Sequence, residues 1–164
     1  MSTSYSTEVS DQFNEWSHGY RKIQHTKATV RLVEEYLQRI PLESKDDHRK
    51  LLNTIALLKA ADRICSASMW LVAHMTYAKR VPMDGSVLTA DDFKKKAQGH
   101  TGGALNMTPA YTGYLLANSL SGKTRSWVMG QGHCVAAIEA VNAIIGNQYE
   151  EKAKLYENKE TRTE

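Results

Sequence analysis

The stretch WVMGQGHCVAAIEAV, residues 127–141, decides the fold class. It opens with a short apolar and β-prone run, continues through a glycine-rich turn at residues 130–133, and ends in a helical pattern that begins at Cys134. We therefore expect a strand at residues 126–129 that leads through the turn into a helix. Such a turn presents backbone N–H groups to an anion, so the segment predicts either a phosphate or diphosphate site or a plain turn in which the glycines only satisfy backbone angles.

A second glycine-rich segment, GHTGGALN at residues 99–106, also leads into a helical pattern. Its histidine, His100, has glycine on one side and threonine on the other, with no bulky neighbour to bury it. Imidazoles suit proton transfer near neutral pH and hydrogen bonding to phosphate or sugar hydroxyls. Two Gly-His turns that each open a helix can converge at one pocket if the helices are neighbours. We expect His100 and His133 to form such a site; the alternative is that both are idle loop histidines.

Helical patterns dominate the rest of the chain. Thr26 is a predicted N-cap for an amphipathic helix that ends before Pro41. Ser44 and Asp47 form an approximate capping box that opens a pattern running to Tyr77. About 35 residues is long for one globular helix, so we expect a break or a kink near residues 65–68.

The remaining segments are assigned by their local signals. The proline and the Asp-Gly turn in residues 80–98 predict a loop, with a short helix after Thr89. We divide the chain into an N-terminal arm at residues 1–25, a domain at residues 26–147, and a charged, solvated tail at residues 148–164.

The other histidines are expected to be structural. His74 lies on an apolar helical segment and is predicted to be a core histidine with its hydrogen bonds satisfied. His18, His25 and His48 lie in polar stretches and are predicted to be solvated.

Composition excludes several classes of protein. The chain has 164 residues, 41% apolar and 24% charged, with three prolines, which excludes collagen-like and wholly disordered chains. Lys and Arg number 21 against 18 Asp and Glu, a bias too small to predict nucleic-acid binding. No long apolar run or secretory leader is present, so we expect no membrane partner and a cytoplasmic location. Cys65 and Cys134 are interpreted as reduced thiols.

Residues 99–103, GHTGG, and residues 129–133, MGQGH, resemble the two Gly-His loops of a known family. That family is the transketolase and phosphoketolase group of thiamine diphosphate enzymes, in its N-terminal, diphosphate-binding domain. Residues 51–145 also resemble a bacterial phosphoketolase-like subgroup that acts on xylulose 5-phosphate, some members being described as 3-epimerases. The resemblance implies an α/β fold, of which this chain would hold a helix-rich N-terminal part with few strands.

The resemblance also implies roles for individual residues. His100 and His133 would be catalytic, with His100 contacting the substrate hydroxyls or the reaction intermediate. Gly130, Gln131, Gly132 and His133 would lie against the diphosphate side of the cofactor. Thiamine diphosphate and magnesium are the implied cofactors, and the cofactor carries the difficult chemical step.

Three departures from the family pattern limit what this chain can do alone. It contains no Gly-Asp-Gly motif for magnesium, no second-domain glutamate to activate the cofactor, and none of the later-domain residues that clamp a sugar phosphate. We therefore expect an incomplete enzyme that needs a complementing chain or forms a homo-oligomer. Two alternatives remain open: a non-catalytic helical interaction module, and a cofactor-free sugar-phosphate 3-epimerase that uses His100 and His133 as acid and base.

Overall fold

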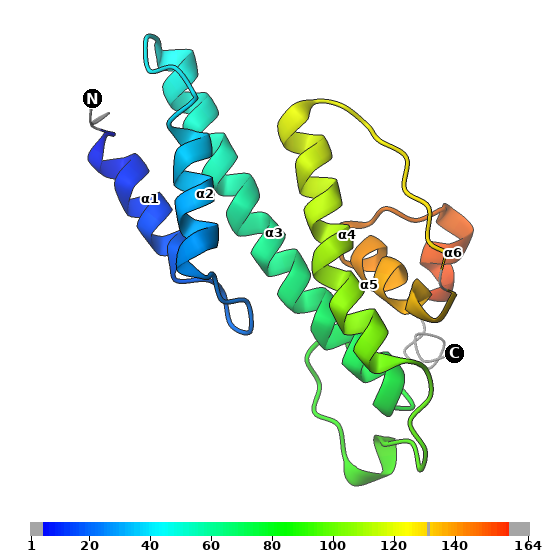
Figure 1. Cartoon of the computed structure of the whole chain (residues 1–164). Helices are drawn as coiled ribbons and strands as arrows, with labels where there is room; N and C mark the ends of the chain where they lie inside the picture. The colour runs from blue at the N-terminus through cyan, green and yellow to red at the C-terminus, as the bar shows by residue number, and fades with distance from the viewer. Residues whose placement is uncertain (1–4, 131, 158–164) are drawn as a thin grey trace. The chain divides into compact units, whose positions relative to one another are not determined.

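The computed structural model describes residues 5–130 and 132–157 of the chain. Within these residues the secondary structure consists of helices and two isolated β-bridges (Figure 1). None of the described helices is long and apolar enough to cross a membrane. The helices, in chain order, are α1 (Thr7–Ser17), α2 (Lys27–Leu37), α3 (Lys45–Tyr77), η1 (Ala90–Asp92), α4 (Thr101–Ser121), η2 (Gly132–Cys134), α5 (Val135–Ile145) and α6 (Glu150–Leu155).

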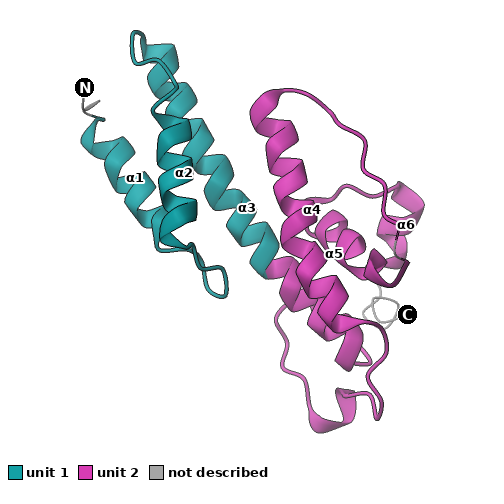
Figure 2. Cartoon of the chain, viewed as in Figure 1, with its two compact units in different colours: residues 1–66 teal, residues 67–164 magenta. Residues whose placement is uncertain are grey.

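The chain divides into two compact units, residues 1–66 and residues 67–164 (Figure 2). The boundary falls within α3, which contributes its first part to unit 1 and its last part to unit 2. The predicted domain at residues 26–147 crosses this boundary and stays a prediction. Each unit is described separately below.

Unit 1 contains α1, α2 and the first part of α3. The predicted cap signals are confirmed, because the Thr26 hydroxyl accepts a hydrogen bond from the Thr29 N–H at 3.1 Å and the Ser44 hydroxyl accepts one from the Asp47 N–H at 3.2 Å. The Asp47 carboxylate in turn accepts from the Ser44 N–H at 3.1 Å, which completes the capping box. The core of the unit is made of buried side chains from all three helices: Val9, Trp16, Leu37, Leu51, Ile55 and Leu58.

We predicted a break or a kink near residues 65–68. The break is wrong, because α3 is one continuous helix of 33 residues, and the kink stays a prediction. Cys65, Ser66 and Ser68 are all buried. The small side chains at these positions therefore allow other parts of the chain to pack closely against α3. They do not terminate the helix. Burial of this kind stabilises a long helix without a cap in its middle.

Unit 2 contains the last part of α3 and helices α4, α5 and α6. Helices α4 and α5 pack directly against each other. Both end at a glycine in the left-handed region, Gly122 at φ +63° and Gly146 at φ +67°, a conformation that favours glycine. The buried core joins α3, the following loop, α4 and α5 through Leu71, Val72, Val81, Ala104, Ala137 and Ala140. This packing brings the start of α4 close to the start of α5.

The predicted strand at residues 126–129 is wrong, since these residues have no regular secondary structure. The segment is held by side chains: the Trp127 ring lies 5.4 Å from that of Tyr111 and 4.9 Å from that of Tyr114, both on α4. The Tyr114 hydroxyl donates to the Arg125 carbonyl. A strand needs a neighbouring backbone to pair with, and no described residue pairs with this segment. We expected a helix-rich part of an α/β fold with few strands. The described residues confirm the high helix content and contain no strand.

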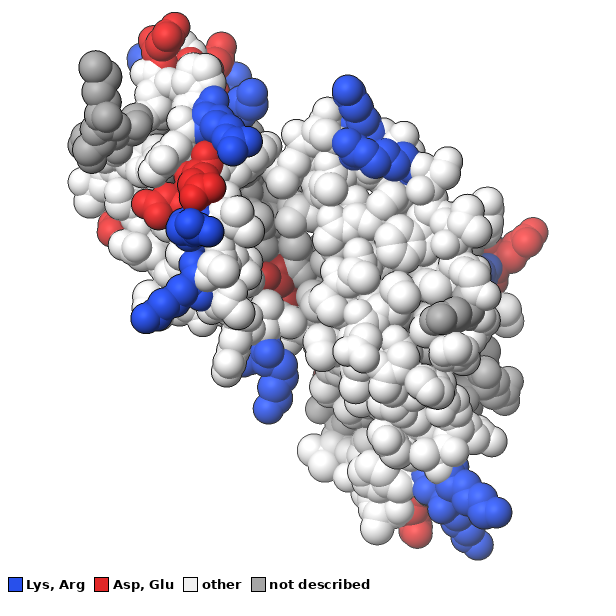
Figure 3. Space-filling model, viewed as in Figure 1, with Lys and Arg blue, Asp and Glu red and all other residues white. Residues whose placement is uncertain are grey.

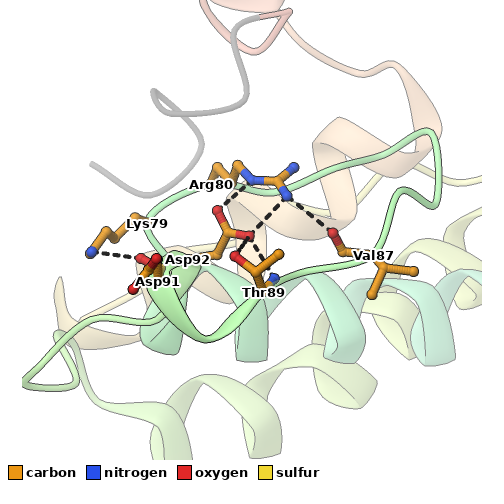
Figure 4. A network of polar contacts seen from close by, with 6 residues as sticks. All are labelled: Lys79, Arg80, Val87, Thr89, Asp91 and Asp92. Atoms are coloured by element: carbon orange, nitrogen blue, oxygen red, sulfur yellow. Dashed lines mark hydrogen bonds and ion pairs between the residues drawn. The ribbon is translucent and has the colours of Figure 1, made fainter.

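The loop between α3 and α4 is closed by a polar network (Figure 4). The Arg80 guanidinium donates to both carboxylate oxygens of Asp92, at 2.6 and 2.9 Å. Asp92 also accepts from the Thr89 N–H at 2.7 Å, as part of a capping box around η1. Together these bonds hold the pKa of Asp92 well below its usual range. The short helix predicted after Thr89 is thus present only as this single 3-10 turn.

The predicted solvated tail folds back onto unit 2 in its described part. Helix α6 follows α5, and Lys152 lies 2.6 Å from the Glu139 carboxylate of α5. The Tyr156 hydroxyl donates to the same carboxylate at 3.3 Å. Burial, together with the neighbouring Glu139 charge, raises the pKa of Tyr156 to about 12. Residues 158–164 lie outside the described part of the chain.

Candidate functional site

His100 is the N-cap residue of α4. Its Nδ1 atom accepts a hydrogen bond from the backbone N–H of Gly103 at 2.9 Å. Because a backbone N–H can only donate, Nδ1 carries no proton in this arrangement, and the neutral ring has its proton on Nε2. The cap therefore fixes both the orientation of the ring and its tautomer.

His133 lies in η2, immediately before α5, and reaches the same place. The centres of the His100 and His133 rings are 4.6 Å apart, with the ring planes tilted by 58°. The expectation that the two Gly-His segments converge is confirmed. The packing of α4 against α5 explains the convergence, because each histidine lies at the N-terminal end of one of the two helices.

Both imidazoles line one cavity of about 190 Å³ in unit 2. The backbone N–H of Gln98 donates to the Thr76 carbonyl at 3.1 Å, which holds the loop before α4 against the end of α3. No lysine, arginine or carboxylate belongs to the described lining. The lining residues are Met75, Thr76, Gln98, Gly99, His100, Ala104, His133 and Ala136.

Gly103 positions His100, a role that we did not predict from the sequence. A Cβ atom at Gly103 would lie 2.6 Å from His100 Nδ1 and 3.2 Å from Cys134 Sγ. The first distance is too short for any side chain, so the ring would have to move. Cys134 is buried beside this contact, with 1% of its surface exposed. The sequence did contain a signal for this role, namely the second glycine of the Gly102-Gly103 pair. Without a side chain at this position, the backbone of α4 can approach the ring of His100.

The glycine turn before α5 has open space beside it. Gly130 has no left-handed φ, and a Cβ atom at Gly130 or at Gly132 would meet no described heavy atom within 4 Å. Neither a close contact with a described atom nor a left-handed φ therefore requires glycine at position 130, and the same is true of Gly102 and Gly113. Gln131 lies outside the described residues.

The described residues do not by themselves fit thiamine diphosphate with its metal. They contain no group of three His, Cys, Asp or Glu side chains that could hold a metal ion. The cavity of about 190 Å³ is also smaller than the roughly 300–1,000 Å³ typical of sites for cofactor-sized ligands. What the chain does offer is a pair of imidazoles and an open glycine turn.

Two other histidines differ from their predictions. His25 is not solvated: 10% of its side chain is exposed, and its Nε2 lies 2.9 Å from the Asp62 carboxylate. His74 is half-buried and not in the core, and its ring lies 3.9 Å from the exposed ring of Trp70 with the planes tilted by 34°. Its Nδ1 donates to the Trp70 carbonyl at 2.8 Å. Polar neighbours in the sequence concealed the burial of His25, because its partner lies 37 residues away.

No protein-family model matches this chain, and neither a curated protein nor a solved structure matches it. The resemblance to the thiamine diphosphate enzymes therefore depends on the sequence motifs alone.

Proposed function

We propose that this chain supplies the histidine half of a ketose-phosphate site in a thiamine diphosphate-dependent enzyme. The enzyme would belong to the transketolase and phosphoketolase group and act in the cytoplasm on substrates such as xylulose 5-phosphate. The observation that carries the proposal is the 4.6 Å approach of His100 and His133 at one cavity. Both histidines come from the segments that resemble the family's Gly-His loops.

The geometry supports different tasks for the two imidazoles. His100 is held by its cap with the proton on Nε2, so it is suited to donate a hydrogen bond to a hydroxyl or carbonyl oxygen of the substrate. His133 belongs to a short 3-10 turn beside an open glycine turn and is suited to move a proton near neutral pH. Because the rings are in contact, both would act on one side of a bound sugar.

The rest of the site would come from a complementing chain or a second copy. The magnesium ligands, the activating carboxylate and the phosphate clamp have no counterpart among the described residues. No step through the cofactor is therefore assigned to this chain. Its own contribution is to orient the substrate oxygens and to hold a proton on His100 Nε2.

Helix α4 presents a surface on which such a partner could pack. No residue of α4 is Asp, Glu, Lys or Arg. In Figure 3 the face of unit 2 around α4 is correspondingly almost free of charged side chains. Small exposed residues follow one side of the helix at spacings of three and four, and they define the small-residue face: Gly102, Asn106, Ala110, Gly113 and Ala117. A face of this kind allows close approach of another chain without burying unpaired charge.

The test is cofactor binding with and without a partner. Thiamine diphosphate and magnesium are titrated into the chain while Trp127 emission is followed, first alone and then with a phosphoketolase fragment that begins downstream of the second Gly-His loop. A Trp127→Phe variant identifies the share of the signal that comes from this residue. We expect saturable binding only with the fragment present, and phosphoketolase activity that falls by about a hundredfold or more in His100→Ala or His133→Ala.

The alternatives give different results in the same experiment. An interaction module would bind the fragment with the same affinity in the double histidine variant and show no activity. An epimerase would act without cofactor. The structure gives less support to the epimerase, because an acid and a base on opposite sides of one carbon would each lie about 3–3.5 Å from it, and rings in contact leave no space for that carbon. Failure of the fragment to restore cofactor binding would contradict the proposal.

A further inference from the structure

Unit 1 contains a second candidate site, an open hollow of about 390 Å³ between the end of α1 and one side of α2. It is independent of the His100 and His133 cavity, since all its residues belong to unit 1. Two imidazoles and two cationic side chains meet there. The lining residues are Ser17, His18, His25, Lys27, Val30, Arg31 and Glu34.

The loop between α1 and α2 is tightly built and brings the two histidines to the hollow. Tyr20 and Ile23 exchange backbone hydrogen bonds of 3.0 and 2.9 Å, which closes the loop. Gly19 has φ +76°, and a Cβ atom there would lie 2.2 Å from the Ile23 carbonyl oxygen, so only glycine fits. Arg21, inside the loop, has a positive φ of 55°. His18 and His25 flank this closed segment.

His25 is held from behind by two buried groups. Its Nε2 lies 2.9 Å from the Asp62 carboxylate of α3, and its ring stacks on that of Trp16 at 4.3 Å. Asp62 is 9% exposed and Trp16 is 3% exposed. A carboxylate accepts, so His25 Nε2 donates to it, and Nδ1 is the ring atom left for another partner. Burial raises the pKa of Asp62, while the hydrogen bond from His25 opposes that shift.

His18 is oriented in a similar way. Its Nδ1 donates to the Asn14 carbonyl at 2.6 Å, which leaves Nε2 for another partner. The Ser17 hydroxyl donates to the same carbonyl at 2.8 Å and not to His25. Ser17, His25 and Asp62 therefore do not form a nucleophilic triad, and the set is better suited to binding than to covalent catalysis.

The charge of the hollow favours an anion. Lys27 and Arg31 contribute two positive charges against the single carboxylate of Glu34, and protonation of either imidazole adds to the excess. The contact of Arg31 with Glu35 is long, at 3.8 Å, and both side chains are exposed, so it competes little with a ligand. A guanidinium and an ammonium around an open volume are donors that recognise a tetrahedral phosphate. The remaining ring nitrogens, Nε2 of His18 and Nδ1 of His25, become donors when the rings are protonated.

We propose that the hollow binds the phosphate group of a small phosphomonoester, with Arg31 and Lys27 supplying the charge and His25, braced by Asp62 and Trp16, supplying an oriented ring nitrogen. The residues that carry this site are separate from those of the proposed ketose-phosphate site. Its failure and that of the proposed function are therefore distinguishable.

The test is an NMR titration of the full chain with inorganic phosphate and with glucose 6-phosphate, following the histidine ring signals. We expect saturable shifts of the His18 and His25 signals with both probes. Lys27→Gln and Arg31→Gln together should weaken binding by about a hundredfold, since each lost charged hydrogen bond costs about tenfold. Lys45→Gln, which removes an exposed lysine of unit 1 outside the hollow, should leave the affinity unchanged.

Two further variants show which residues bind the phosphate. The His100→Ala, His133→Ala double variant should keep the shifts of His18 and His25, which shows that unit 1 and not the cavity of unit 2 responds. A His25→Gln variant that keeps its melting temperature and loses binding assigns His25 to the site; if it only unfolds, the Lys27 and Arg31 result decides. Absence of saturable shifts up to about 50 mM phosphate, or equal binding by the Lys27→Gln, Arg31→Gln variant, would overturn the proposal.

Discussion

At the scale of single residues, His100 connects the folding of unit 2 with its proposed chemistry. Its ring caps α4 through Nδ1, so the bond that starts the helix also directs Nε2 and its proton. A histidine that only bound substrate would not be needed for the helix, and a capping serine would not offer a ring nitrogen. The glycine at position 103 makes this double use possible, because any side chain there would meet the ring.

Gly103→Ala tests this dependence. The new Cβ atom would lie 2.6 Å from His100 Nδ1, so the ring must leave its capping position. We expect the free energy of unfolding of Gly103→Ala to lie about 1 kcal/mol or more below that of Gly102→Ala, because both variants gain the helix propensity of alanine and only Gly103→Ala loses the cap. We also expect the ring signals of His100 to shift. The matched control is Gly102→Ala, whose Cβ would meet no described atom within 4 Å. Equal stability and unchanged His100 signals in Gly103→Ala would show that the ring is not held as described.

Asp92 provides a pH-dependent prediction. Arg80 and the Thr89 N–H hold the pKa of Asp92 below its usual range in the folded protein. The folded state therefore releases this proton more readily than the unfolded state, which gives a stability contribution that is present above the ordinary carboxyl pKa and lost as the pH falls below about 4.

Asp92→Asn should accordingly lower the stability at neutral pH and flatten the acid limb of the stability curve. Asp91→Asn is the control, because only the backbone carbonyl of Asp91 takes part in the network, where it accepts from Lys79. Urea unfolding between pH 3 and pH 7 measures both variants. Parallel curves for the wild-type protein and Asp92→Asn would contradict the role given to this carboxylate.

At the scale of elements, the sequence predicted the helix starts that depend on hydrogen bonds between near neighbours in the chain. Thr26 and the Ser44 capping box act within three residues, and both were predicted from the sequence. The strand predicted at residues 126–129 is absent, because β-prone residues form a strand only where another backbone pairs with them, and such pairing depends on distant parts of the chain. The break in α3 failed for a similar reason, since the burial of Cys65 and Ser68 depends on packing that the helical pattern does not contain.

The same distinction applies to the candidate sites. The two Gly-His turns could be found because each is a short motif. Their convergence was predicted only on the condition that the two helices are neighbours, and the structure supplies that condition. The pair formed by His25 and Asp62 could not be found, because the two residues are 37 positions apart and no local pattern connects them.

Gly113, in the middle of α4, gives a prediction about helix stability. It has no left-handed φ, and a Cβ atom there would meet no described heavy atom within 4 Å. Glycine in the interior of a helix costs about 0.5–1 kcal/mol relative to alanine. Gly113→Ala should therefore raise the free energy of unfolding by about that amount in a urea titration. A loss of stability would mean that the exposed side of α4 is covered within the folded chain.

At the scale of the whole molecule, the small-residue face of α4 connects the fold with the partner that we propose. Its residues are exposed, uncharged and small, while the cavity at the start of the same helix lacks the charges that a ketose-phosphate enzyme needs. His100, which lines this cavity, lies at the N-terminal end of the same helix. The missing ligands and clamp would then arrive with the surface that covers α4.

Gly113→Arg tests whether this face is where the partner binds. The arginine has space in the isolated chain and is a better helix former than glycine, so the melting temperature should not fall. In the complex the same side chain would bury a charge at the interface, and association with the phosphoketolase fragment should weaken by about tenfold or more, as measured by calorimetry. Ser119→Arg, on an exposed position about 120° around the helix, adds the same charge off the face and should leave association unchanged. If both variants bind the fragment like the wild-type chain, the partner uses another surface; if both weaken it equally, net charge and not the small-residue face controls binding.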